Sequence, residues 1–188
     1  MQNRCDWSLS NDLMIKYHDT EWGVPNHNDK KLFEYLVLDA FQAGLSWNTI
    51  LQKRKNFKIA FDNFNANKIA DYNQKKITSL MNDEGIIRNK LKIQSTVINA
   101  RLFLEMKAKY GTFDKFIWKF VDGKPVINQW NLMKQIPATS KESDAMSKEL
   151  KKLGFKFVGS TICYAFMQAS GMVNDHLSNC FRRSELLQ

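Results

Sequence analysis

Apolar side chains recur at intervals of three and four residues along most of this chain, and few helix-breaking residues interrupt them. Leu32, Leu36, Val37 and Ala40, for example, fall on one face of a helix that Asn28 or Asp29 can cap. Only 3 prolines and 8 glycines occur among 188 residues. The pattern predicts an all-α fold with helices over residues 32–42, 47–61, 66–72, 74–81, 93–110, 113–121, 139–153 and 155–171, while residues 126–137 carry no clear pattern.

The length and composition predict a single domain. A chain of 188 residues with 44% hydrophobic residues can bury a substantial core. No internal repeat or low-complexity linker divides it, so we expect one bilobed domain over residues 1–188. The N-terminus lacks an apolar run of signal-peptide length and no window has the length of a membrane span, which predicts a cytoplasmic protein without membrane contact. The net charge of +9 favours a polyanionic partner such as nucleic acid or an anionic surface.

The three cysteines do not form a disulfide framework if the compartment is reducing. Cys163 lies in an apolar segment and is expected to be a buried structural thiol. Cys5 and Cys180 lie in polar segments near the two ends of the chain. His176 and Cys180 are four residues apart, a spacing that places two side chains on one helical face, and Cys5 with His18 supplies a second pair. These four residues predict a structural metal site in which four protein ligands leave no open position, and such a site would join the two ends of the chain. Alternatively, the four residues have no metal-binding role.

Residues 38–47, LDAFQAGLSW, place an acid inside an apolar helical pattern. Asp39 lies in the helix, the pattern breaks at Ala43 and Gly44, and it resumes at Trp47. A buried carboxylate beside an aromatic residue at a helix break indicates a pocket. In the alternative interpretation, Asp39 faces solvent and Trp47 is ordinary core.

Residues 82–93 connect two predicted helices. Gly85 is followed by Ile86 and by the basic side chains of Arg88, Lys90 and Lys92. Such a turn can present backbone N–H groups to a phosphate while the isoleucines anchor it, as in a helix-hairpin-helix element. The alternative is an ordinary corner between two helices.

Several runs of the sequence together resemble the DNA-3-methyladenine glycosylase I family. These runs are RCDW at residues 4–7, YHDTEWGVP at 17–25, KLFEYLVLDAFQAGLSW at 31–47, GIIRNKLKI at 85–93, SDAMSKELKKLGFKFVGSTICYAFMQASG at 143–171 and VNDH at 173–176. The resemblance covers nearly the whole chain in order. It implies a helix-hairpin-helix DNA glycosylase fold with a hairpin element at about 80–95. It also implies a monomer that flips 3-methyladenine out of alkylated double-stranded DNA and hydrolyses its N-glycosidic bond.

The resemblance also assigns residues to sites. It implies one structural zinc ion per chain, held by Cys5, His18, His176 and Cys180. It places Asp39 in base recognition and Tyr17, Trp47, Trp7 and Trp22 in or near the base pocket. Gly44 and Leu45 would approach the gap that the flipped base leaves, with Leu45 as a plug, although Leu45 can equally be core. The hairpin residues Gly85, Ile86, Arg88, Lys90 and Lys92 would contact DNA.

The residue types fit the chemistry of this family. N3-methylation makes adenine cationic and already a good leaving group, and an aromatic cage with a carboxylate recognises that charge. The family lacks the aspartate that elsewhere in its superfamily follows the hairpin, and here no acid occurs between Ile93 and Glu105. No feature of the sequence singles out a lysine that could form a Schiff base with the deoxyribose, so we expect an abasic product without strand cleavage.

The sequence departs from the family pattern at one pocket position. The family carries glutamate where this chain has Asp39, and Ala40 and Phe41 replace a smaller or more polar pair. The shorter side chain keeps a second hypothesis open, a non-catalytic protein that binds alkylation lesions on the same scaffold. A third hypothesis is a helical nucleic-acid-binding module with a zinc staple, but such a module has no need of the aromatic cage.

Overall fold

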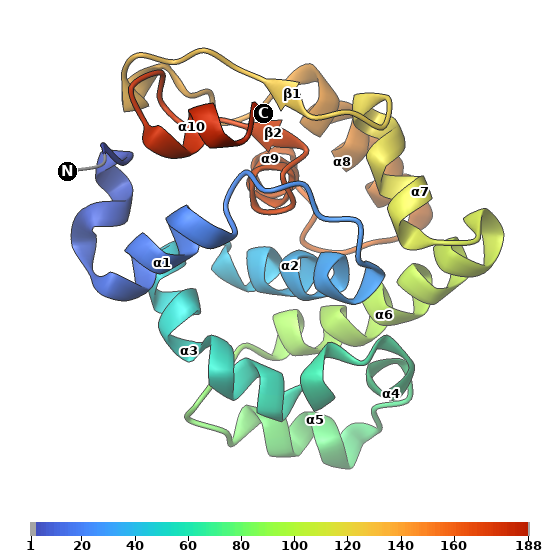
Figure 1. The fold of residues 1–188 in the computed structure, drawn as a ribbon. Coiled ribbons are helices and arrows are strands. Elements are labelled where there is room, and N and C mark those ends of the chain that lie inside the picture. The colour runs from blue at the N-terminus through green and yellow to red at the C-terminus, as the bar shows by residue number, and fades with distance from the viewer. Residues whose placement is uncertain (1–2, 188) are drawn as a thin grey trace.

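Helix α2 (Asp29–Gln42) lies in the middle of the fold, between α9 (Ser160–Ala169) and α6 (Lys90–Tyr110), as Figure 1 shows for the computed structural model. The structure describes residues 3–187, so the ends of the predicted 1–188 domain lie outside the described residues. All side chains from Leu32 to Phe41 are buried, because helices pack against α2 on several sides. An acid within this helix is therefore held away from water.

The remaining elements surround this centre. The other helices are α1 (Asp12–Thr20), α3 (Trp47–Ala60), α4 (Ala66–Ala70), α5 (Gln74–Met81), α7 (Phe113–Trp118), α8 (Lys141–Leu153) and α10 (Phe181–Glu185), with 3-10 helices at Asp6–Ser10, Asp62–Phe64, Lys119–Val121 and Met133–Gln135. The strands β1 (Val126–Ile127) and β2 (Val173–Asn174) pair in parallel, with Val126 opposite Val173. The all-α prediction therefore needs one correction, since these two residue pairs join segments far apart in sequence.

The predicted break after α2 is confirmed. Helix α2 begins after Asn28, whose side chain accepts a hydrogen bond from the Lys31 amide, and it ends at Gln42. Gly44 then adopts a φ of +77°, a left-handed conformation that glycine adopts at little cost. The Ser46 side chain caps the start of α3 by accepting from the Thr49 amide.

Two predicted helix starts in the second half are wrong. The capping box of α8 is formed by Ser140 and Ser143, not by Thr139 and Glu142. Helix α9 starts at Ser160 and not at Phe155, because other elements hold the preceding backbone in a bent loop, in which Phe157 has a φ of +55°. The side chain of Asn99 donates to the Lys156 carbonyl at 3.0 Å and accepts from its amide at 2.8 Å. These tertiary hydrogen bonds override the helical pattern of the segment.

The N-terminal segment lies next to the segment that begins α10 (Figure 1). The Phe181 amide donates to the Asn3 carbonyl at 2.9 Å. Nearby, the Arg4 guanidinium makes a forked ion pair with Asp19, with its closest N–O distance at 2.8 Å. This juxtaposition brings together segments that are more than 150 residues apart.

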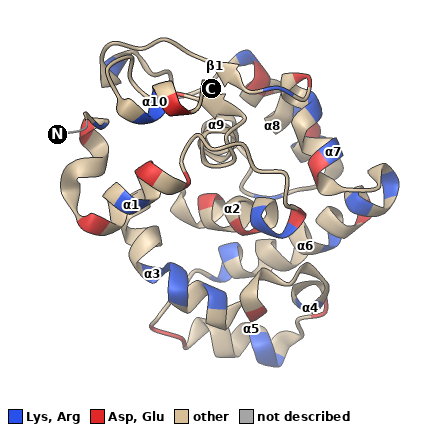
Figure 2. Ribbon diagram, viewed as in Figure 1, with Lys and Arg blue, Asp and Glu red and all other residues tan. Residues whose placement is uncertain are grey.

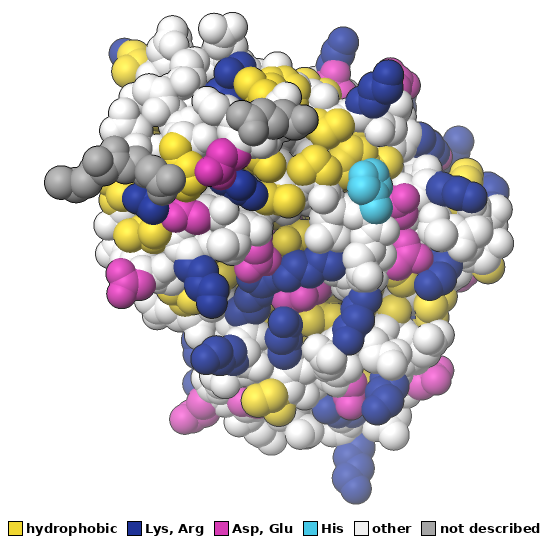
Figure 3. Space-filling model, viewed as in Figure 1, with side chains coloured by type: hydrophobic (Ala, Val, Ile, Leu, Met, Phe, Trp, Pro, Cys, Tyr) yellow, Lys and Arg dark blue, Asp and Glu magenta, His cyan; other side chains and the backbone are white. Residues whose placement is uncertain are grey.

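Charged residues are spread over the helices (Figure 2), and Lys and Arg side chains intermingle with acidic ones across the middle of the face in Figure 3. Between α2 and α3, Arg54 binds Glu21 and Glu34 with N–O distances of 2.7–2.8 Å. Burial opposes ionisation of Glu21, but the hydrogen bonds from Arg54 outweigh it and lower the pKa of Glu21 to about 2. Part of the basic run in α3 is therefore structural.

Within the described residues, no helix is long and apolar enough to cross a lipid bilayer.

Gly171, after α9, supplies a first test of this packing. Its φ is +71°, and a Cβ there would overlap the backbone of Val24 and Pro25. We expect Gly171→Ala to lower the free energy of unfolding by about 3 kcal/mol, from strain plus overpacking. Gly123 is the matched control, because its φ is +72° but nothing lies within 4 Å of the added Cβ. Gly123→Ala should cost about 1 kcal/mol in urea unfolding, and equal losses would contradict the packing shown for Gly171.

Candidate functional site

A cavity of about 370 Å³ opens between α1, α2, α3, α9 and the segment that follows β1. Its walls combine aromatic rings with a few polar groups. The lining residues are Trp7, Tyr17, Trp22, Asp39, Gln42, Trp47, Met133, Ile136, Pro137, Ala138, Thr161, Tyr164, Ala165 and Gln168. The size suits a planar heterocycle rather than a large ligand.

Aromatic side chains from three segments form one wall. The ring centroids of Tyr17 and Trp47 are 5.1 Å apart, those of Trp7 and Tyr17 are 6.3 Å apart, and those of Trp7 and Trp22 are 5.0 Å apart. None of these pairs is stacked in parallel, so the rings meet at angles of 49–75°. Such rings can cover the faces of a bound planar molecule.

Asp39 supplies the charge of the cavity. Its side chain is 1% exposed, and Oδ2 has no hydrogen-bond partner among the described residues. The same is true of Trp47 Nε1. Burial raises the pKa of Asp39 well above its ordinary value, against the smaller opposing effect of Arg54. An acceptor and a donor that are buried without partners indicate a site that a ligand completes.

Among the described residues, no side chain that lines the cavity carries a positive charge that would repel a cation. None of its described lining residues is Lys, Arg or His, although the whole chain has a net charge of +9. A carboxylate with electron-rich rings in such a cavity favours a flat, positively charged ligand over an anionic one.

The structure thus brings together all five residues that the sequence placed in or near the pocket: Asp39, Tyr17, Trp47, Trp7 and Trp22. Sequence reasoning missed the wall formed by α9, which contributes Thr161, Tyr164 and Gln168. The three lie at intervals of three and four residues, so their shared helical face was visible in the sequence. The helix was interpreted only as core, because apolar residues surround them.

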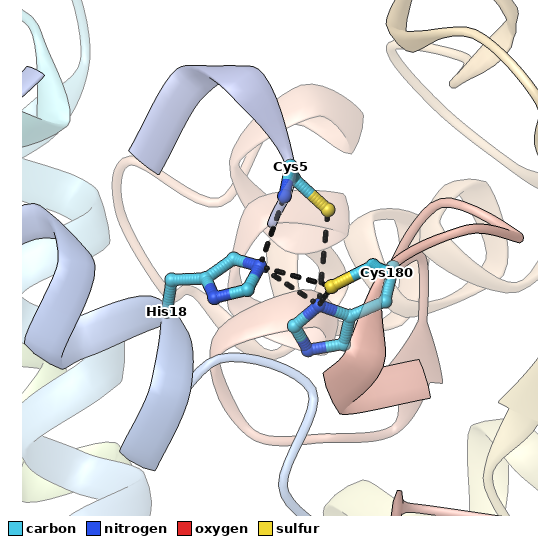
Figure 4. A group of neighbouring side chains, drawn as sticks. Cys5, His18 and Cys180 are labelled. Atoms are coloured by element: carbon cyan, nitrogen blue, oxygen red, sulfur yellow. Dashed lines mark hydrogen bonds between the residues drawn. The ribbon is translucent and has the colours of Figure 1, made fainter. Parts of the chain in front are cut away.

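Cys5, His18, His176 and Cys180 form a second, fully buried cluster, whose ligand atoms all lie within 4.8 Å of one another. Figure 4 shows Cys5, His18 and Cys180 converging from the two ends of the chain. Sγ of Cys180 lies 3.4 Å from His18 Nε2 and 3.5 Å from His176 Nδ1. The two imidazole nitrogens are 3.2 Å apart.

These separations fit a tetrahedral ion. Metal–sulfur bonds of about 2.3 Å and metal–nitrogen bonds of about 2.1 Å place S and N about 3.6 Å apart and two N atoms about 3.4 Å apart. The outer hydrogen bonds agree, since His18 Nδ1 lies 2.8 Å from Asp19 Oδ1 and His176 Nε2 lies 3.0 Å from the Trp22 carbonyl oxygen. If His18 Nδ1 and His176 Nε2 are protonated, the lone pairs of His18 Nε2 and His176 Nδ1 face each other and repel. A cation bound between these two nitrogens removes that repulsion. The cluster can therefore hold a metal ion.

The predicted reason for the His176 and Cys180 pair was wrong, although both residues lie in the cluster. Their four-residue spacing does not place them on a helix face, because residues 175–180 form an irregular turn and Cys180 immediately precedes α10. The hydrogen bond with Cys5 lowers the pKa of the Cys180 thiol below its ordinary value, so this thiol is the first of the pair to ionise.

The hairpin residues lie between α5 and α6. Gly85 packs closely on α3, where an added Cβ would lie 3.1 Å from Cβ of Asn56. Its own N–H donates to the Asp83 carboxylate at 2.8 Å, so it is not free for a phosphate here. Ile86 is buried and anchors the turn, while Arg88 is exposed and lies 3.5 Å from Glu84. Lys90 is exposed at the start of α6.

Lys92 differs from the other basic residues. Its side chain is buried, and Nζ donates to the Phe41 and Ala43 carbonyls at 2.8 and 2.6 Å. The amine therefore caps the C-terminal end of α2 instead of pointing to solvent, and burial lowers its pKa. Beyond that cap, Gly44 and Leu45 are exposed, which is inconsistent with Leu45 as core.

This chain is similar in sequence and in structure to proteins named as 3-methyladenine DNA glycosylases. A family model described as methyladenine glycosylase matches residues 7–183. DNA-3-methyladenine glycosylase 1 of Escherichia coli K12 is 48% identical over 177 residues, which cover 94% of this chain and 95% of that protein. DNA-3-methyladenine glycosylase of Haemophilus influenzae is 43% identical over 180 residues, which cover 96% and 97%.

Two solved structures are similar over the same length. A crystal structure of 3-methyladenine DNA glycosylase I has a TM-score of 0.93 at 49% identity, covering 95% of this chain and 98% of that chain. A variant of 3-methyladenine DNA glycosylase I in complex with 3-methyladenine has a TM-score of 0.93 at 33% identity, covering 96% and 97%.

Proposed function

The chain belongs to the methyladenine glycosylase family, and from this membership we propose that it excises 3-methyladenine from alkylated DNA. It hydrolyses the N-glycosidic bond of the flipped base and leaves an abasic site. We propose that it acts as a monomer, as the family resemblance implies. The proposed partner is double-stranded DNA that contains alkylated adenine.

The observation that carries the proposal is the composition of the cavity. Buried Asp39 lies among aromatic rings, and no Lys, Arg or His is among the described residues that line the cavity, so this arrangement favours a cationic purine. In 3-methyladenine the positive charge weakens the bond to the deoxyribose, so water can displace the base with little protonation by the protein. The cavity binds the departing base, and stabilisation of the developing charges by fixed groups lowers the barrier.

The arrangement of lysines supports a glycosylase without lyase activity. Strand cleavage by this class of enzyme requires an amine that attacks the deoxyribose carbon. Lys92 is the buried lysine next to the hairpin, but its Nζ is bonded to two carbonyl oxygens at the end of α2. None of the described cavity residues carries an amine. The expected product is an intact strand with an abasic site.

The metal of the terminal cluster is proposed to be one zinc ion per chain. Two thiolates and two imidazoles form the donor set that zinc prefers in structural sites, and four protein ligands leave no open position for catalysis. The ion joins residue 5 to residue 180 and thereby fixes Trp7, Tyr17 and Trp22, which flank the ligands and line the cavity.

For DNA contact we propose the helix-hairpin-helix element at residues 80–95 and the exposed turn at Gly44 and Leu45. Arg88 and Lys90 are exposed on the hairpin, where they can approach phosphates. Lys92 acts indirectly, since it links the start of α6 to the turn that carries Leu45. Gly85 and Ile86 shape the hairpin by close packing and burial.

The experiment that tests the proposed activity is release of free bases from methylated duplex DNA, measured by chromatography. We expect stoichiometric release of 3-methyladenine and an uncleaved strand that breaks only on alkaline treatment. Binding to methylated DNA without release would favour the non-catalytic lesion-binding protein. Absence of both binding and release would contradict both functions.

Leu45 supplies a prediction about the flipped state. Its side chain is 40% exposed at the turn before α3, so it can fill the space of the extruded base. We expect Leu45→Ala to reduce excision from duplex DNA about tenfold, the cost of losing roughly 1.4 kcal/mol of apolar contact. Excision from single-stranded DNA should change less than twofold. Ile59→Ala on α3 is the control, since Ile59 is 79% exposed and lies outside the cavity. An equal loss on both substrates would argue against a plug.

A further inference from the structure

The guanidinium of Arg54 joins three of the elements that carry cavity residues. Arg54 lies on α3, about two helical turns after Trp47, and its side chain is only 12% exposed. Nη1 and Nη2 donate to the two carboxylate oxygens of Glu21, each at 2.8 Å, and Nε donates to Glu34 at 2.7 Å. Glu34 lies on α2, and Glu21 directly follows α1. The ends of these contacts therefore lie on α1, α2 and α3.

Glu21 connects this contact to the aromatic wall of the cavity. The N–H groups of Glu21 and Trp22 both donate to the Tyr17 carbonyl, at 2.9 and 3.0 Å, and Tyr17 and Trp22 line the cavity. Because Arg54 holds the Glu21 carboxylate at two points, the end of α1 is fixed relative to α3, which carries Trp47. A forked guanidinium contact fixes orientation as well as distance, which the single ammonium of a lysine does not.

The burial of these charges indicates a role beyond stability. Glu34 is 5% exposed, and Lys31 adds a second cation, with Nζ 2.9 Å from Glu21 and 3.4 Å from Glu34. Removing such groups from water is unfavourable, and well-packed apolar side chains often hold elements together at least as strongly. Apolar side chains would supply neither the fixed directions of the hydrogen bonds nor a charge.

The charge of Arg54 also acts on Asp39. Burial is the larger influence on Asp39 and opposes its ionisation, whereas the positive charge of Arg54 favours it. The ionisable groups on the elements near Asp39 are Tyr17 of α1, Arg54 of α3, Lys92 of α6, and Cys163 and Tyr164 of α9. Asp62 and Asp114, on the two other elements that contact α2, bind Tyr72 and His27.

We propose that Arg54 is a positioning residue of the cavity, which fixes the end of α1 against α2 and α3 and favours the carboxylate form of Asp39. This inference rests on the proposed glycosylase function. Arg54 is not among the described residues that line the cavity, so it does not touch the base. It acts through Glu21 and Glu34 and through its charge.

The test measures kcat/KM for release of 3-methyladenine from methylated duplex DNA across a pH series. The methylated base is already cationic in the DNA, so a decline toward low pH reports protonation of the protein. Arg54→Gln removes the cation and leaves Glu21 and Glu34 with less positive charge beside them. Both changes raise the pKa of Asp39, so the midpoint of the decline should move to higher pH by about one unit. A folding defect alone lowers the rate at every pH and leaves the midpoint in place.

Two further variants separate position from charge. Arg54→Lys keeps the cation but loses the forked contact, so we expect the original midpoint and a rate about tenfold lower. Lys58→Gln is the matched control, since Lys58 is 44% exposed and its Nζ lies 3.8 Å from Glu34. It neutralises a cation beside the same acid and should keep the midpoint, with a rate within about twofold of the original.

A double variant keeps the inference testable if Arg54→Gln does not fold. Combined with Glu21→Gln, it removes the cation together with an acid that the cation binds, while Glu34 keeps Lys31. The midpoint should still move to higher pH. Metal content is measured at each pH, because protonation of the cysteine and histidine cluster also weakens metal binding and would lower the rate of every variant at the same pH.

The outcomes separate the two claims. No release of 3-methyladenine by the unmodified protein at any pH would overturn the proposed function. Normal release by the unmodified protein, with either an unmoved midpoint in Arg54→Gln or an undiminished rate in Arg54→Lys, would overturn the role of Arg54 and leave the function standing.

Discussion

Asp39→Asn is expected to lower the rate of 3-methyladenine excision by about 100-fold or more while making the folded protein more stable. The carboxylate is the one charged group on the cavity wall, and Oδ2 has no other partner among the described residues. Its loss removes a charge-assisted contact to a cationic base, an effect of about 3 kcal/mol in a buried site. Single-turnover excision from methylated duplex DNA measures the loss.

The gain in stability follows from linkage between folding and ionisation. Burial raises the pKa of Asp39 above its ordinary value of 3.8, so the folded state holds this proton more tightly than the unfolded state. Stability is unaffected below pH 3.8 and falls as the pH rises from there toward the folded pKa. Asparagine does not ionise. In urea unfolding, the free energy of unfolding of the variant should therefore exceed that of the original protein at pH 8, and the difference should shrink progressively at lower pH.

Asp39→Glu tests the shorter side chain directly. It restores the residue of the family pattern and extends the carboxylate by one methylene. If the carboxylate of Asp39 reaches the base through a water, Asp39→Glu should change excision less than tenfold, in contrast to Asp39→Asn. Glu105→Gln, which neutralises an exposed acid on α6, is the charge control and should leave excision unchanged. Undiminished excision by Asp39→Asn would exclude the carboxylate from recognition.

Cys180→Ala is expected to abolish stoichiometric metal binding and to lower the free energy of unfolding by about 4–6 kcal/mol. The four residues of the cluster join the two ends of the chain, so a metal bound there would contribute directly to folding. The loss should appear as a lower midpoint of thermal unfolding, with zinc content measured on the same sample. A chelator should lower the midpoint of the unmodified protein in the same direction.

Cys163→Ala provides the matched control for this cysteine. Cys163 is also buried, but its Sγ donates to the Val158 carbonyl and lies outside the metal cluster. Its replacement should keep one metal per chain and cost only about 1–2 kcal/mol from a small cavity and a weak hydrogen bond. Equal losses of stability in the two variants would contradict the structural metal site that joins the two ends of the chain. Full stability of the unmodified protein without metal would also contradict it.

Local features of the sequence determined where two central helices begin and end. The boundaries of α2 and α3 follow from the caps Asn28 and Ser46 and from Gly44, because each acts on backbone groups within a few residues. The acid within an apolar pattern indicated a pocket at Asp39 but left a solvent-facing side chain open, and the packing of α2 decided its burial. The residue types and spacings of Cys5, His18, His176 and Cys180 likewise left open whether they form a metal site or are incidental.

Only the tertiary structure decided where these groups lie. The loop before α9 is not helical because Asn99, more than 50 residues away, holds its backbone. Lys92 turns inward because the end of α2 offers it two carbonyl oxygens. The buried carboxylate of Asp175 finds its hydrogen-bond donors only when Tyr164, on α9, and Trp130, after β1, meet on it. Spacing along a chain records contacts within a helix turn or a strand, whereas these contacts depend on how helices pack, which no local pattern encodes.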